Sequence, residues 1–426
     1  MEETRRVVIT GIGPITSIGI GRDEFWENLL NKKISVSEIP QRFERNHKFR
    51  SRFYVPFPEF SIEDYGIPSK YNSLMEETSK LSLVGSILAL HDAGFNGDDL
   101  KSMIPENLQN SMVILGIGIG ALRTALYQYA IQALSHRPEI LEELDVYPRY
   151  NRMAIPSIMP NSATSWVTIL FGITGPNFTI NTSCSSGTYA IGEAYQKISR
   201  GSADMIISGG IECLKDNVGA TMRGFDTLGT LTKSDDGKPL PFSKQRSGFL
   251  FSEGGGCILI LEELESARKR NAPIYCEIVG YASNSDAYNV VQMQPSGDQV
   301  KKLITGVIGE NKIDYLNTHG TATLLNDEIE AMIIQDLFGN KETQPLINST
   351  KGNLGHSIGA AGAIEIAVTA LSVKENRIHA NLSEDLIDNL NIANKTINHE
   401  VNFALSASYG FGGHNSVILL KKYTER

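Results

Sequence analysis

The sequence predicts an α/β fold, and three observations lead to that class. Apolar runs rich in β-branched residues recur along the 426 residues, each bounded by glycine, as is typical of strands buried on both faces. Helical stretches separate these runs, so strands and helices alternate. A weak repeat links the two halves, because one glycine- and alanine-rich stretch begins at Cys184 and another at Gly355. Such a duplication would place two similar helix starts near a common centre.

The predicted strands and loops can be placed along the chain. Two long segments, residues 40–68 and 233–248, contain prolines and polar residues and are predicted to be irregular surface loops. The predicted strands occupy residues 6–13, 112–120, 205–210, 275–282, 315–320 and 403–410.

Two helices matter most for the argument. After Cys184, apolar residues such as Ile191 and Ile198 recur at helical spacing, and Gly201 is suited to end that helix. Residues 355–371 are apolar or small nearly all round, which predicts a wholly buried helix.

The bulk composition limits the possible functions. A chain of 426 residues exceeds one ordinary domain, and we expect two halves, residues 1–265 and 266–426. The net charge of −9 argues against general nucleic-acid binding. The glycine run after the first strand lacks the full dinucleotide-binding pattern and its acidic partner, so a dinucleotide-binding protein is disfavoured.

The cysteines and the first residues indicate the compartment. The four cysteines lie far apart with no CxxC pair, so neither a disulfide framework nor a zinc site is expected. The chain starts with charged residues that run directly into a strand, without the apolar core of a signal peptide. No apolar stretch reaches membrane-spanning length. We therefore expect a soluble cytoplasmic protein with reduced thiols and no membrane partner.

Cys184 is the candidate nucleophile. It follows a strand-like segment and stands at or just before the helix that continues to residue 199. Free N–H groups and the positive end of a helix dipole stabilise a thiolate, and a thiolate attacks thioesters. The same strand-to-helix turn also occurs in hydrolases, so this feature alone does not identify the reaction.

Three further polar residues stand at predicted element ends. His319 ends a predicted strand, and imidazole donates hydrogen bonds or moves protons near neutral pH. Lys351 precedes the buried helix and His356 opens it. A lysine there can shift the pKa of its neighbours. Each of the three, taken alone, is more often a structural or surface residue.

Taken together, these segments resemble a known family. The chain carries, in this order, TSCSSGTYAIG, THGTAT, STKGNLGHSIGAAGA and SYGFGGHN. This set is similar to the β-ketoacyl-[acyl carrier protein] synthase I/II branch of the thiolase-like superfamily. The similarity covers almost the entire chain, beginning with RRVVITGIG.

The resemblance implies a five-layered αβαβα fold of two duplicated halves, usually dimeric. Cys184 would take an acyl chain from an acyl carrier protein, and His319 with His356 would drive malonyl decarboxylation for a Claisen condensation. Lys351 would orient the histidines. The remaining implied roles are pantetheine binding by Thr321 and Thr323, a gate at Phe411, an oxyanion hole from the backbone N–H groups of Cys184 and Phe411, and an acyl pocket around Ile119 and Phe411. No metal or cofactor is implied, because phosphopantetheine arrives on the carrier.

Related enzymes differ at particular residues. A thiolase would carry a second cysteine in the C-terminal glycine loop, and an initiating synthase would carry asparagine in place of His356. A chain-length factor, the silent homologue, would lack Cys184. An active Cys-His-His enzyme is favoured, and a non-catalytic chain-length-factor-like partner is the alternative.

Three departures from the fatty-acid members favour a type II polyketide ketosynthase, with fatty-acid elongation as the alternative. HGTATLLND has Leu324 and Asn326 where HGTxTPxGD is usual. The usual basic residues before the second helix are replaced by Glu76 and Glu77, and Asn289 replaces a histidine. Polyketide ketosynthases often pair with a chain-length factor, so a homodimer and a heterodimer both remain open. The positive charges that would compensate for the missing basic residues of the usual carrier-docking surface are those of Lys70, Arg149 and Arg152.

Overall fold

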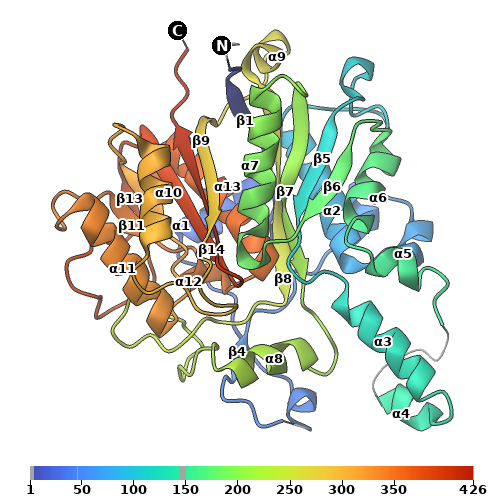
Figure 1. Cartoon of the computed structure of the whole chain (residues 1–426). Helices are drawn as coiled ribbons and strands as arrows, with labels where there is room; N and C mark the ends of the chain where they lie inside the picture. Colours follow the sequence, from blue (N-terminus) through green and yellow to red (C-terminus); the bar gives the residue numbers. More distant parts are fainter. Residues whose placement is uncertain (1–3, 46, 144–149, 426) are drawn as a thin grey trace.

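The computed structural model describes residues 4–45, 47–143 and 150–425. Within them an eleven-stranded mixed sheet forms the centre (Figure 1). Its main path, read across the sheet, is β11 (Leu346–Asn348), β10 (Tyr315–Asn317), β14 (Phe403–Gly410), β15 (His414–Lys421), β9 (Cys276–Ser285), β1 (Val7–Thr16), β8 (Gly254–Glu263), β7 (Met205–Cys213), β5 (Met112–Gly116) and β6 (Asn177–Ile180), with β2 (Gly19–Ile20) beside β1.

The two halves of this sheet have the same pairing pattern. From β1 outward, β8 and β7 pair antiparallel while β7, β5 and β6 run parallel. From β9 outward, β15 and β14 pair antiparallel while β14, β10 and β11 run parallel. The antiparallel pair β1 and β9 joins the halves. The predicted duplication is therefore confirmed in the sheet, while the division after residue 265 falls inside α9 (Leu264–Lys269) and stays a prediction.

Side chains alternate between two cores along each strand, which explains the layers. In β8, Leu259 and Leu261 face a core that contains the central helices α7 (Ser186–Ser199) and α13 (Ala361–Glu375). Ile258 and Ile260 face the opposite core under α2 (Glu77–Asp92) and α6 (Ser162–Phe171). The C-terminal half packs its outer face on α10 (Asp298–Ile308) and α11 (Leu324–Phe338). This alternation confirms the five layers.

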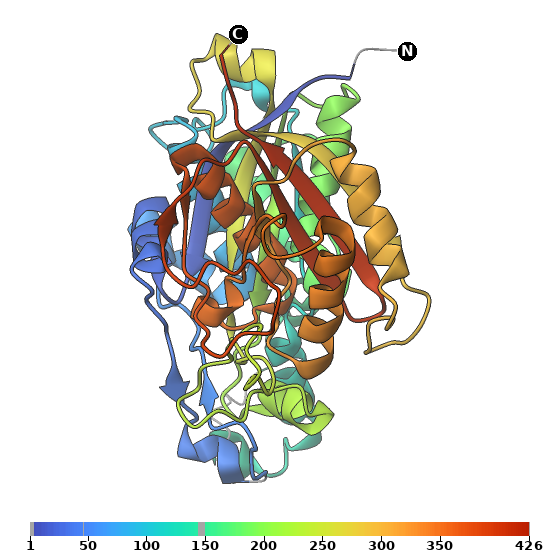
Figure 2. The same cartoon turned by 90° about the vertical axis from the view of Figure 1, so that its left-hand side faces the viewer.

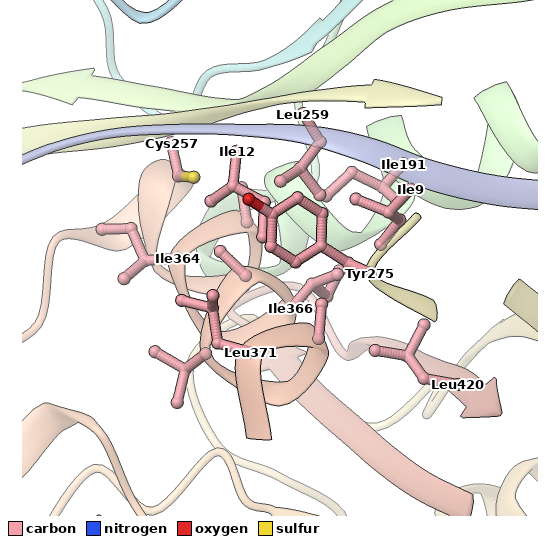
Figure 3. Packing of buried hydrophobic residues seen from close by; sticks show 14 of the residues in the cluster. Ile9, Ile12, Ile191, Cys257, Leu259, Tyr275, Ile364, Ile366, Leu371 and Leu420 are labelled. Carbon is pink, nitrogen blue, oxygen red and sulfur yellow. The ribbon is translucent and has the colours of Figure 1, made fainter. Parts of the chain in front are cut away.

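Figure 3 shows the central core. Ile364, Ile366 and Leu371 of α13 belong to one core with Ile9 and Ile12 of β1, Leu259 of β8 and Ile191 of α7. All residues of α13 from Ala361 to Val373 are buried, as predicted for that segment. The first and last described residues lie at the same end of the molecule, the top of both views, but apart from each other in Figure 2 (Figures 1 and 2).

The remaining elements connect or cover these layers, and α3, α4 and α8 lie at the end away from the termini (Figure 1). They are α1 (Arg22–Leu30), α3 (Leu122–Ala133), α4 (Pro138–Glu143), α5 (Ala154–Ile158), α8 (Ala220–Leu228), α12 (Lys351–Leu354), β3 (Ser37–Glu38), β4 (Phe53–Tyr54), β12 (Arg377–Ile378) and β13 (Ile397–Asn398). None of the helices in the described residues has the length and apolarity needed to cross a membrane.

Three expectations need correction. The helix predicted over residues 355–371 begins at Ala361, because Gly355 and Ile358 have left-handed φ values of 66° and 47°. His356 therefore lies in a bridge to Phe251 and does not open the helix. The segment 40–68 is irregular, but it is not only a surface excursion, because Phe43, Val55 and other side chains in it are buried. Strands β8 and β15, which were not predicted, complete the two half-sheets.

Candidate active site

A strained turn carries Cys184. The chain leaves β6 and passes through a short 3-10 turn, Ser183–Ser185, before α7 begins at Ser186. Ser183 has φ of 57°, a conformation that costs free energy in a residue other than glycine and that recurs at functional sites. Cys184 is 4% exposed. The predicted position just before a helix start is confirmed, and Gly201 ends that helix with φ of 75°.

The electrostatics of Cys184 differ from the expectation of a stabilised thiolate. Burial raises the pKa of the Cys184 thiol above its ordinary value. Three groups oppose this rise: the Ser183 hydroxyl at 3.8 Å from Sγ, the charge of Lys351 and the backbone N–H of Phe411. The thiol is therefore neutral at pH 7, because desolvation outweighs the effect of the helix start.

Two histidines face each other in the same cavity. His319 follows β10, and His356 lies between α12 and the turn at residues 358–360. Their ring centroids are 5.5 Å apart at 85°, and both side chains are buried. Burial and the charge of Lys351 lower both pKa values well below the ordinary value of histidine. Both imidazoles are therefore neutral at pH 7 and can donate an N–H.

Lys351 orients His319. Its Nζ donates to the carbonyl oxygen of His319 at 2.6 Å and lies 3.4 Å from His319 Nδ1. Since an ammonium only donates, Nδ1 must accept, and the proton of neutral His319 resides on Nε2. The same Nζ pairs with the buried carboxylate of Glu365 on α13.

Two buried carboxylates of this region were missed from the sequence. Glu330 of α11 accepts the backbone N–H groups of His319 and Gly320 at 2.9 and 2.8 Å, and burial raises its pKa to about 8. Burial likewise raises the pKa of Glu365 to about 7, although Lys351 lowers it. A signal for Glu365 was present, because it is the only acidic residue in the apolar stretch 355–371. Glu330 had no such signal.

A cavity of about 340 Å³ joins most of the predicted site. Its lining includes Cys184, His319, His356, Thr321, Thr323 and Phe411. The hydroxyls of Thr321 and Thr323 lie 3.0 Å apart. Lys351 stands behind His319 rather than in the lining, and Ile119 is also outside it, with a side chain that is 39% exposed.

The mouth of this cavity is apolar. Leu228, Val291, Leu324 and Leu325 line it, and each is partly or largely exposed. Asn289, whose departure from the family pattern had no assigned consequence, caps the rim loop by accepting the N–H groups of Val291 and Gln292.

The charged residues considered for carrier docking differ in their exposure and contacts. Glu76 caps α2 by accepting the N–H of Glu77 and is half-buried. Lys70 lies over the Tyr71 ring, and Arg152 is exposed. Arg149 lies outside the described residues.

Comparisons with known proteins agree across the whole chain. Residues 4–267 match the family model "Beta-ketoacyl synthase, N-terminal domain", and residues 275–385 match "Beta-ketoacyl synthase, C-terminal domain". The chain is 33% identical over 436 residues to 3-oxoacyl-[acyl-carrier-protein] synthase 2 of Staphylococcus aureus (strain COL), covering 99% of this chain and 100% of the relative.

Solved structures are also similar to this chain over nearly its whole length. The ishigamide ketosynthase/chain length factor superposes with a TM-score of 0.84 at 25% identity. AntDE:AntF, a type II PKS acyl-carrier protein in complex with its ketosynthase bound to the hexaketide, superposes with a TM-score of 0.80 at 26% identity. Both likenesses cover 99% of this chain and 100% of the other.

Proposed function

Because this chain belongs to the beta-ketoacyl synthase family, and is thus an acyl-transferring condensing enzyme, we propose that it extends an acyl group held on Cys184 with malonyl units brought by an acyl carrier protein. The observation that carries the proposal is the cavity shared by Cys184, His319 and His356. Carrier-bound substrates of this kind would be met in the cytoplasm.

In the first half-reaction Cys184 Sγ attacks the carbonyl carbon of the acyl thioester. The new C–S bond forms as the bond to the carrier's sulfur breaks, and the carrier leaves as a thiol with the proton that Cys184 loses. The backbone N–H groups of Cys184 and Phe411 hold the oxyanion. Removal of one such donor costs about 3 kcal/mol in transition-state stabilisation.

In the second half-reaction malonyl-carrier loses carbon dioxide. The electron pair of the broken C–C bond moves into a thioester enolate, and the neutral imidazoles of His319 and His356 donate to its oxygen. The enolate carbon then attacks the Cys184 thioester, a C–C bond forms, and Cys184 leaves and regains a proton. Thr321 and Thr323 hold the pantetheine arm. Decarboxylation supplies the driving force, so we propose no metal or organic cofactor on this chain.

We propose type II polyketide synthesis as the pathway. Leu324 and Asn326, and the likeness to a ketosynthase/chain length factor and to a polyketide ketosynthase, support this choice. The 33% identity to a 3-oxoacyl synthase keeps fatty-acid elongation as the alternative. Preferential loading of 2-enoyl or 3-oxoacyl chains on Cys184 supports the polyketide role, whereas preferential loading of saturated chains favours elongation.

We propose that the carrier docks on the apolar mouth. Its exposed side chains are Leu228, Val291, Leu324 and Leu325, and the arm must pass between them to reach Cys184. Related synthases usually carry basic residues where this chain has Glu76 and Glu77. Apolar contacts at the mouth would bind the carrier here instead.

We also propose a dimer, with a second copy or a homologous chain-length factor. Strand β6 ends the sheet, and exposed apolar side chains of α5 and α6 stand beside it, among them Ile155, Met159 and Ile169. Open strand edges with apolar neighbours favour pairing.

The decisive test is intact-protein mass spectrometry with acyl and malonyl carriers. The wild type should gain the acyl mass on Cys184 and then release a condensed product. Cys184→Ala should do neither, while Cys213→Ala, which removes another buried cysteine in β7, should behave as the wild type. Condensation by Cys184→Ala would overturn the proposal.

The histidines have a separate test. His319→Ala and His356→Ala should each lower labelled carbon dioxide release from malonyl-carrier by about a hundredfold, since each removes an oxyanion donor. Acyl loading of Cys184 serves as the control for folding. Release at the wild-type rate would refute the assigned roles.

A further inference from the structure

The strand that leads into the C-terminal glycine loop carries a tyrosine in the wall of the cavity. Tyr409 stands near the end of β14, is 7% exposed and belongs to the cavity lining. Side chains alternate along a strand, and the hydroxyl of Ser408 bonds that of Thr188 on α7 at 2.8 Å. Tyr409 therefore faces away from α7. On that face the centroid of its ring lies 5.5 Å from that of His319, with the rings inclined at 64°.

The same end of β14 lies directly against the nucleophile turn. Gly410 follows Tyr409 in the chain. A Cβ added at Gly410 would lie 3.2 Å from the nitrogen of Cys184 and 2.6 Å from the carbonyl oxygen of Thr182. Glycine allows this close approach of one backbone to another. The packing of the strand on the turn thus holds Tyr409 beside the space in which the acyl group and the malonyl unit would meet.

The hydroxyl of Tyr409 is available as a hydrogen-bond donor. None of the described residues forms a hydrogen bond with it, whereas the hydroxyls of Thr321 and Thr323 bond each other. Burial raises the pKa of Tyr409 well above its ordinary value, and the charges of Glu330 and Asp286 raise it further. The phenol is therefore protonated at pH 7. A buried donor without a partner costs free energy, which a substrate oxygen would recover.

The cavity offers no cation to a negatively charged substrate. Among the described residues that line it there is neither a lysine nor an arginine. His319 and His356 are neutral, because burial and the charge of Lys351 lower their pKa values. A malonyl unit carries its carboxylate one CH₂ away from the thioester carbonyl. When the histidines hold that carbonyl oxygen, the carboxylate lies next to them and must be met by neutral donors.

We propose that Tyr409 contacts the substrate and selects malonyl-carrier, through a hydrogen bond from its hydroxyl to the malonyl carboxylate. The inference rests on the decarboxylation proposed above. When the C–C bond breaks, its electron pair enters the enolate and carbon dioxide leaves without charge, so this hydrogen bond weakens as the reaction proceeds. Tyr409 keeps its proton throughout. The contact therefore strengthens binding of the substrate more than binding of the transition state.

The test is Tyr409→Phe, which removes the hydroxyl and keeps the ring beside His319. In enzyme that is already acyl-loaded, KM for malonyl-carrier should rise about tenfold, because a hydrogen bond to a charged group is lost. The kcat for labelled carbon dioxide release should not fall, since the lost contact belongs to the ground state. Tyr281→Phe is the matched control: it makes the same change in a tyrosine of β9 outside this cavity and should leave both constants unchanged.

Acetyl-carrier separates recognition of the carboxylate from binding of the arm, because it has the same arm and no carboxylate. Its inhibition constant against malonyl-carrier should be the same in the wild type and in Tyr409→Phe. An unchanged KM in Tyr409→Phe protein that loads Cys184 normally would overturn the inference, as would an equal loss of affinity for acetyl-carrier. Wild-type protein that loads Cys184 but releases no labelled carbon dioxide from malonyl-carrier would instead refute the proposed function.

Discussion

The buried side chain of Lys351 affects both the stability of the fold and the pKa values of two neighbouring histidines. The ammonium is buried, and its charge is compensated by Glu365 on α13. The same charge lowers the pKa of His319 and His356 and keeps them as neutral donors. The pair therefore combines a stability effect with an effect on the histidines, and variants can separate the two.

Lys351→Met should destabilise the fold by about 3 kcal/mol, because it leaves Glu365 buried without a partner. The double variant Lys351→Met with Glu365→Gln should regain most of that stability, since no unpaired charge remains. Chemical denaturation measures both values. Activity should stay low in both variants. The pKa values of the two histidines should rise without the charge of Lys351, so the acidic limb of the pH profile of labelled carbon dioxide release should move to higher pH. Recovery of full activity in the double variant would contradict the orienting role of Lys351.

His379 gives a separate pH prediction. It is fully buried, hydrogen-bonded to the Ala380 carbonyl and near the Thr350 hydroxyl, and burial lowers its pKa to about 4. The unfolded chain binds this proton near pH 6.5, so folding stability from this group is present above that pH and is lost as the pH falls toward 4. In His379→Gln, the loss of unfolding free energy across that window should be smaller by about 3 kcal/mol. Equal slopes in urea titrations of both proteins would contradict the assignment.

At the residue scale, the sequence could identify the groups that carry reactive atoms but not those that hold them. Cys184 and His319 stand at recognisable element ends, and both share the cavity with His356. Glu330 and Glu212 bind backbone N–H groups of loops remote in sequence, so their role exists only after the halves pack. The raised pKa of the Cys184 thiol was missed for a similar reason, because the extent of burial is a tertiary property.

At the scale of elements, helix α11 contributes to the site at two places. Arg246 donates to the carbonyls of Thr323 and Leu324 and fixes the first turn, while Glu330 further along binds the His319 loop. Leu324 then projects at the mouth and is 59% exposed. A single helix start thus connects the histidine to the proposed docking surface.

Leu324→Glu should raise KM for carrier-bound substrate about tenfold, which corresponds to about 1.4 kcal/mol of docking free energy. The added carboxylate would replace an apolar contact with the carrier and would have to lose its hydration on docking. The kcat for a short pantetheine thioester, which needs no docking, should be unchanged. An equal loss with both substrates would place the effect in the cavity and contradict docking at the mouth.

Strands and helices could be predicted where an apolar sequence pattern coincides with burial in the structure. The six predicted strands are present, and all but β9 are buried along most of their length. The helix over residues 355–371 was misplaced at its start, since Gly355 and Ile358 adopt left-handed φ values that apolar periodicity cannot reveal. β8 was missed although CILIL is apolar, because its first three residues are glycines, which are typical of loops.

On the scale of the whole molecule, the two half-sheets are equivalent except at their outer edges. The β11 edge is covered, because Ile347 exchanges backbone hydrogen bonds with Asn391 and Ala393. No comparable backbone cover lies on the outer edge of β6 within residues 4–45, 47–143 and 150–425. Since the halves share one pairing pattern, this difference supports the proposal that β6 pairs with another chain. Exposed apolar residues on the adjacent α6 support the same conclusion.

Ile169→Glu tests that conclusion. Ile169 on α6 is 59% exposed, and in a two-fold dimer the substitution would appear twice across one interface. Burying these carboxylates should raise the dissociation constant of the dimer at least about tenfold, measured by light scattering after size-exclusion chromatography over a range of concentrations. Leu324→Glu is the matched control, because its side chain is equally exposed but lies at the cavity mouth. A wild type that remains monomeric throughout, or an Ile169→Glu protein as dimeric as the control, would show that β6 is not the subunit contact of this chain with itself.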